Sequence, residues 1–132
     1  MGQQQLLLIV LSVIIVGIAV VVGINMFSAS AASANLEAVT SDLLNLASRA
    51  QQYYVKPSGM GGGGNSFVDI SIGELTPKAT NDNGTYTIST AGTATLVGIQ
   101  GVGVQDGDSD GTNCTVVVTV FSDSIATSVS NR

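Results

Sequence analysis

Residues 6–24 constrain this chain more than any other segment, because they are apolar on every side of a helix. Fifteen of these nineteen residues are leucine, isoleucine or valine, and no charged side chain precedes Glu37. At a helical rise of about 1.5 Å per residue, the segment can cross a hydrocarbon core of roughly 30 Å. Burying each such side chain is worth about 1.5 to 3 kcal/mol, so leaving the segment in water would cost upwards of roughly 20 kcal/mol. The segment therefore belongs in lipid or among copies of itself, through Leu6, Leu7, Leu8, Ile9, Val10, Leu11, Val13, Ile14, Ile15, Val16, Ile18, Val20, Val21, Val22 and Ile24.

Two common uses of an N-terminal apolar segment fit the flanking residues less well. A secretory signal peptide would explain residues 29–31 and 32–34, which both match the A-x-A cleavage pattern. The first five residues, MGQQQ, carry no positive charge, however, and the apolar run is longer than that of a usual signal peptide. An ordinary membrane anchor has basic residues near one end, whereas the nearest one here is Arg49. A basic leader removed before Met1 would supply the missing charges.

The chain continues from the apolar segment as an amphipathic helix. From residue 36 onward, apolar residues recur in steps of three and four, which is the spacing of one helical face. The first proline is Pro57, and the residue before a proline avoids the helical region. We therefore expect an unbroken helix from about Gln4 to Tyr54, apolar in its first half and amphipathic in its second. The stripe that packs on the rest of the protein would consist of Leu36, Val39, Leu43, Leu46, Ala50 and Tyr53.

The remaining chain predicts a small β-rich head. A glycine-rich connector occupies residues 57–66, and it lacks the Lys-Ser or Lys-Thr of a phosphate-binding loop. Alternating or β-branched residues then predict strands at 67–72, 84–90, 94–105 and 114–121. Glycines inside the third of these indicate a bulge or a close backbone approach. The polar tail, 122–132, could add a short strand or fray.

These elements predict an α+β fold with three parts. Residues 1–56 form the helix of the membrane or filament core, 57–66 the connector, and 67–132 a globular head. In the head, about four antiparallel strands would cover the amphipathic half of the helix with one face of the sheet.

Composition argues against several functional classes. The net charge is −5, from four basic and nine acidic residues, and neither histidine nor tryptophan occurs. This acidity disfavours nucleic acid and anionic lipid surfaces as partners. Cys114 is the only cysteine, so an intrachain disulfide is excluded and a zinc site has no ligands to complete it. No catalytic constellation is present, and we expect neither an enzyme nor a bound cofactor.

One acidic motif could bind a cation. Asp106, Asp108 and Asp110 precede Gly111 in the D-x-D-x-D-G spacing that begins a calcium loop. The twelfth position of that motif is Val117, where such a loop requires a bidentate glutamate. The motif is therefore either a solvated turn between two strands or a calcium site, and we expect it to face solvent in both cases.

Two sites match the acceptor pattern for N-linked glycosylation. They begin at Asn83 and Asn113, each of which is followed two residues later by threonine. Asn83 falls in a predicted turn, whereas Asn113 adjoins a predicted strand.

The chain resembles the type IV pilin family over its whole length. The resemblance rests on the order of its parts, which are an apolar helical half, an amphipathic helical half and a small β-rich head. It also rests on the N-terminal segment, residues 1–23, MGQQQLLLIVLSVIIVGIAVVVG. The resemblance implies insertion in the inner membrane, cleavage by a prepilin peptidase, and assembly by the pilus machinery into an extracellular filament. Many bacterial members have glutamate at the fifth mature position. With Met1 as the mature N-terminus, which we favour, that position is Gln5, so the family's salt bridge to the N-terminal amine is not carried over. The chain also lacks a proline near residue 22 and the paired cysteines of many pilins.

The sequence thus predicts a structural subunit, similar to a major pilin, that polymerises through its apolar helix. Two alternatives remain: a monomeric membrane-anchored surface protein, and a pseudopilin of a secretion system.

Overall fold

The computed structural model describes residues 2–132, which fall into two compact units that meet between Ala31 and Ala32. We call residues 32–132 the head unit. The elements in chain order are α1 (Gly2–Val55), the short 3-10 helix η1 (Ser58–Met60), α2 (Ile72–Leu75), β1 (Gly84–Thr90), β2 (Leu96–Gly103), β3 (Thr115–Phe121) and β4 (Ile125–Asn131). The α+β class predicted from the sequence is confirmed.

Helix α1 runs without interruption from Gly2 to Val55, as its lack of proline predicts. The glycine-rich connector folds back over its C-terminal end. The amides of Gly63 and Asn65 donate to the carbonyl oxygens of Tyr53 (2.8 Å) and Tyr54 (2.6 Å), which have no partner within the helix. A Cβ on Gly63 would overlap the carbonyl of Ser66, so only glycine permits this close turn.

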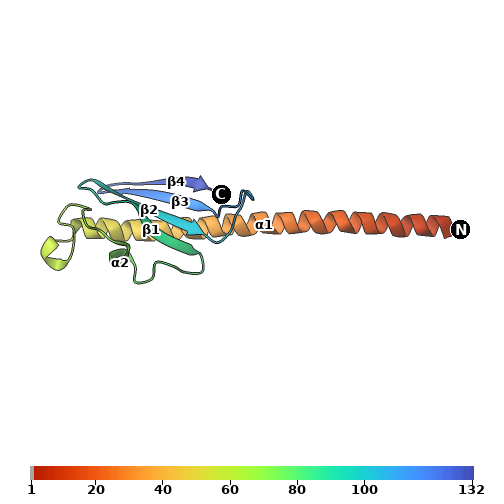
Figure 1. The fold of residues 1–132 in the computed structure, drawn as a ribbon, viewed down its shortest axis with the longest axis horizontal. Helices are drawn as coiled ribbons and strands as arrows, with labels where there is room; N and C mark the ends of the chain where they lie inside the picture. The colour runs from red at the N-terminus through yellow and green to blue at the C-terminus, as the bar shows by residue number, and fades with distance from the viewer. Residues whose placement is uncertain (1) are drawn as a thin grey trace. The chain divides into compact units, whose positions relative to one another are not determined.

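The four strands form one antiparallel sheet in the order β1-β2-β3-β4. One face lies along the second half of α1, as Figure 1 shows. Valine and isoleucine alternate toward the helix, and the fully buried members of that face are Val97, Ile99, Val116, Val118 and Val120. The β-branched side chains favour this pleated surface and fill the space against the helix. The hydrophobic core of the head unit therefore lies between the sheet and α1, and Phe67, Ile70 and Leu75 from the segment around α2 add to it.

Two glycines of β2 allow the helix to approach the sheet closely. A Cβ on Gly101 would lie 2.8 Å from the Val39 side chain, and one on Gly103 would overlap the side chains of Asn35 and Cys114. The close approach expected from the glycines of this strand is thus present. The β1–β2 register also shifts between Ile88 and Thr90.

The predicted strand at residues 67–72 is wrong. Asp69 has a positive φ of 65°, which breaks an extended chain, and α2 begins at Ile72. Phe67 and Ile70 are buried while Val68 is 48% exposed, a spacing of three rather than the alternation of a strand. The fourth strand comes instead from the tail, where β4 pairs with β3.

Candidate functional site

The largest exposed apolar surface belongs to the first half of α1. All fifteen large apolar side chains of residues 6–24 are between 50% and 69% exposed. None of the residues in the most apolar stretch of α1 is buried in the head unit or elsewhere in the described chain. Among the described residues, α1 is the one helix long and apolar enough to cross a membrane.

The predicted packing stripe faces the sheet. Val39, Leu43 and Ala50 are fully buried, and Leu46 is nearly so. Leu36 and Tyr53, at the two ends of the stripe, are partly buried and pack against the same core. This stripe holds the second half of α1 on the head unit.

One flank of α1, beside β4, is open in the head unit. Leu44 is 41% exposed on the helix and Val129 is 46% exposed on β4. Together with Leu36, Glu37, Thr40 and Ser41, they line a shallow hollow of about 310 Å³. This part of the helix carries apolar surface that no described residue covers.

Asn35 joins the helix to the loops at one end of the sheet, and it is a residue that sequence reasoning missed. Its side chain is only 9% exposed. Its Nδ2 donates to the Asn83 carbonyl (2.8 Å), while its Oδ1 accepts from the Val104 amide (3.0 Å) and the Cys114 thiol (3.1 Å). Asn35 lies one position before the apolar stripe, but its partners are 48 to 79 residues away in sequence, so no local pattern identifies them.

Asp42 is the centre of a second polar network that the sequence did not reveal. Its Oδ2 accepts from Asn81 (3.0 Å), Asn83 (3.0 Å) and the Tyr86 hydroxyl (2.5 Å). Burial alone would raise the pKa of Asp42, but the bonds from Asn83, Tyr86 and Asn81 outweigh it and hold that pKa below its ordinary value. Burial, and then the bond to the Asp42 carboxylate, raises the pKa of Tyr86. The network thus keeps Asp42 ionised and Tyr86 protonated.

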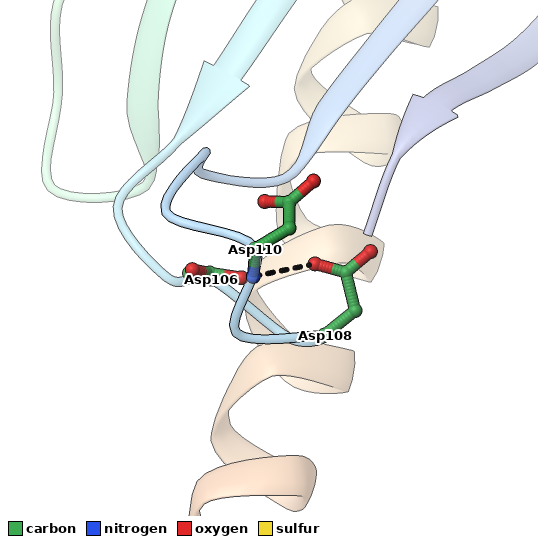
Figure 2. Close-up of side chains that lie close together, drawn as sticks. All are labelled: Asp106, Asp108 and Asp110. Atoms are coloured by element: carbon green, nitrogen blue, oxygen red, sulfur yellow. Dashed lines mark hydrogen bonds between the residues drawn. The ribbon is translucent and has the colours of Figure 1, made fainter.

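The three aspartates of the D-x-D-x-D-G motif lie together in the β2–β3 loop (Figure 2), with carboxylate oxygens within 4.8 Å of one another. Asp106 accepts from the amides of Ser109 (2.7 Å) and Gly111 (2.8 Å), which closes the loop on itself. Desolvation and the neighbouring carboxylates raise the pKa of Asp108. The bond from Asn131 (2.8 Å), supported by the Thr112 amide, lowers the pKa of Asp110.

The loop lies at the surface, with Asp108 and Asp110 exposed and Asp106 partly buried. Oxygen ligands in this arrangement suit a hard cation such as calcium. The loop's backbone amides already use Asp106 and, at 3.3 Å, one oxygen of Asp108. Calcium binding stays a prediction.

The two candidate glycosylation sites differ in their surroundings. The Asn83 amide nitrogen is engaged by Asp42, and the residue is partly buried. Asn113 is exposed, and its amide nitrogen donates to the Gly103 carbonyl (3.1 Å). Both acceptor nitrogens would have to leave these bonds before modification, and Asn113 is the more accessible of the two because it is exposed.

Comparisons with protein-family models, curated protein sequences and solved structures gave no match. The functional argument therefore depends on the residues of this chain.

Proposed function

We propose that this chain is the structural subunit of an extracellular helical filament similar to a type IV pilus. The observation that carries the proposal is the exposure of the apolar side chains all around residues 6–24. A soluble protein does not leave such a surface in water. Inserted in the inner membrane, the segment contacts lipid; in a filament, it contacts the same segment of several neighbouring copies.

Assembly of a filament requires residues 6–24 to move from lipid into contact with other copies of the same segment. Apolar helices and acyl chains are similar surroundings for leucine, isoleucine and valine, so moving the segment from lipid into a helical core is nearly neutral in hydrophobic free energy. Extraction therefore depends on an assembly machine that does work on each subunit. Once assembled, close packing between the helices keeps the filament together.

The exposed hollow beside Leu44 and Val129 also supports assembly over a monomeric anchor. An anchor needs apolar surface only where it meets lipid. This hollow lies on the head unit, where it offers apolar surface to another copy. A secretion-system pseudopilin shares the same architecture and is the second alternative.

The test is to shear surface material from cells that produce the full chain and to examine it by electron microscopy and mass spectrometry. We expect filaments whose main component is this chain. Ile15→Trp keeps the segment apolar and able to enter the membrane, but the larger side chain overpacks a helical core at a cost of about 1 to 3 kcal/mol. Ile15→Leu conserves volume and is the matched control.

A filament subunit predicts that the tryptophan variant reaches the membrane in normal amounts but assembles poorly, while the leucine variant assembles. A monomeric anchor predicts no filaments for any form, and no difference between the two variants.

A further inference from the structure

The last turns of α1 and the segment around α2 enclose an open cleft of about 500 Å³ in the head unit. Its charged lining consists of Arg49, Lys56 and Glu74. Arg49 donates to the Leu75 carbonyl (2.6 Å), which holds its guanidinium at the cleft. We call this hollow the basic cleft, because its two positive charges face one negative charge.

This concentration of positive charge is unusual for the chain. Only four of its residues are basic, against nine acidic ones. Arg49 and Lys56 line the basic cleft, and Lys78 lines an adjoining hollow that Arg49 also borders. Three of the four basic residues therefore gather in one region of an otherwise acidic protein, where Glu74 in the cleft and Asp42 in the adjoining hollow are the acidic residues of the two linings.

The acidic loop of residues 106–110 lies toward the other end of the head unit. The Gly107 amide donates to the carbonyl of Arg132 (3.0 Å), and a Cβ on Gly107 would lie 3.1 Å from that of Ala32. Ala32 precedes Arg49 by seventeen residues of the same helix, or about 26 Å at 1.5 Å per residue. One copy therefore cannot bring its own loop to its own cleft.

We infer that the basic cleft receives the 106–110 loop of a second copy of this chain. In the loop, Asp108 and Asp110 are exposed and Asp106 is partly buried. The Asp108 carboxylate accepts one hydrogen bond, from the Asp110 amide at 3.3 Å. Its charge is therefore free for a partner. Opposite charges aligned across an interface steer association and fix its register.

This contact has the symmetry that a filament needs. Each copy offers its loop to one neighbour and its cleft to another, so the interface is head-to-tail and repeats along an open helical array. The inference rests on the proposed function, and it names a second contact between copies, in the head unit.

The first experiment is a charge exchange in the full chain. Lys56→Glu and Asp108→Lys each replace an attraction by a repulsion, and each should lower the yield of sheared filaments about tenfold. The double variant restores opposite charges with the positions exchanged, and its yield should return to within about threefold of the unmodified chain. Asp82→Lys makes the same charge change at an exposed site outside the loop and should have no such effect.

The second experiment places cysteines beside the two charges and leaves the charges in place, as Gln52→Cys in the cleft lining with Ser109→Cys in the loop, and treats intact cells with a short thiol cross-linker. The natural Cys114 is fully buried and does not compete. A head-to-tail contact gives a ladder of multimers for the double variant, while each single variant gives no ladder. Addition of about 1 M salt shortens the screening length to about 3 Å and should weaken the ladder.

The outcomes separate this inference from the proposed function. Filaments without a ladder, or a double charge variant that stays as defective as the single ones, would overturn the inference and leave the filament proposal standing. A ladder in membranes of cells that form no filaments would support the loop-to-cleft contact and overturn the filament proposal. An assembly defect in Lys56→Glu alone, with Asp108→Lys unaffected, would mean that the cleft binds something other than the loop.

Discussion

Replacing Asn35 by alanine tests how the helix is fixed to the end of the sheet. The substitution removes the acceptor of the Val104 amide (3.0 Å) and the donor to the Asn83 carbonyl (2.8 Å). Both bonds are only partly buried, so each is worth about 0.5 to 1.5 kcal/mol, and losing the two together should destabilise the head unit by about 1 to 3 kcal/mol. For a unit of this size, that corresponds to a fall in melting temperature of roughly 5 to 20 °C.

The assay is thermal unfolding of the full chain in detergent, followed by tyrosine fluorescence. The chain has three tyrosines and no tryptophan. All three tyrosines, at positions 53, 54 and 86, lie in the head unit, so the signal reports on that unit and not on the apolar half of α1. Hydrogen exchange adds a local measurement: the amide of Val104 should lose protection before the strand amides do.

Ser33→Ala is the matched control, because Ser33 is an exposed residue two positions away on the same helix. It should change stability by less than about 0.5 kcal/mol. If Asn35→Ala proves as mild as the control, or if Val104 keeps its exchange protection, the assignment of Asn35 as the polar link is refuted.

Three further predictions concern the head unit. Ionised Asp42 stabilises the fold above the pKa of an unfolded aspartate, and this stability is lost as pH falls through its lower folded pKa. Asp42→Asn should therefore cost about 1 kcal/mol at pH 7 and flatten the loss of stability below about pH 4, which denaturant titrations at several pH values would check. Asp106→Ala should accelerate amide exchange throughout the β2–β3 loop, with or without a chelator, because Asp106 accepts from the amides of Ser109 and Gly111. If the loop binds calcium, a chelator should lower the melting temperature, and Asp108→Asn should abolish that effect. Gly103→Ala should lower the melting temperature sharply, because the added methyl group overlaps the side chains opposite it, whereas unchanged melting would contradict that packing.

The elements predicted correctly are those with a strong local signal. Residues 6–24 are apolar on all sides, and no proline interrupts the helix before Pro57. The strand at Gly84–Thr90 is predicted with its observed bounds, and Thr115–Phe121 within one residue, because both segments are rich in β-branched residues, which favour a half-buried strand.

The errors arose where side-chain hydrogen bonding overrides alternation. Residues 67–72 alternate like a strand, but Glu74 Oε2 accepts from the Ser71 amide (3.1 Å) and starts α2. The S-x-x-E spacing from Ser71 to Glu74 is a sequence signal for a helix start. It competes with the alternation of residues 67–72, which favours a strand. The polar networks around Asn35 and Asp42 could not be predicted, because their partners meet only after the sheet has formed on the helix. The carboxylates of the acidic loop could be placed together from sequence, but their distance from the basic cleft could not.

The order of the strands sets how the head unit can fold. Each strand pairs with the next one along the chain, so every pairing closes only a short loop. The contacts of α1 with the sheet, in contrast, join residues such as Gln51 and Phe121, which are 70 positions apart. Closing such long loops is slow, so the sheet should form first, hairpin by hairpin, and the helix should dock last. Docking of the second half of α1 is therefore the step that completes the core of the head unit.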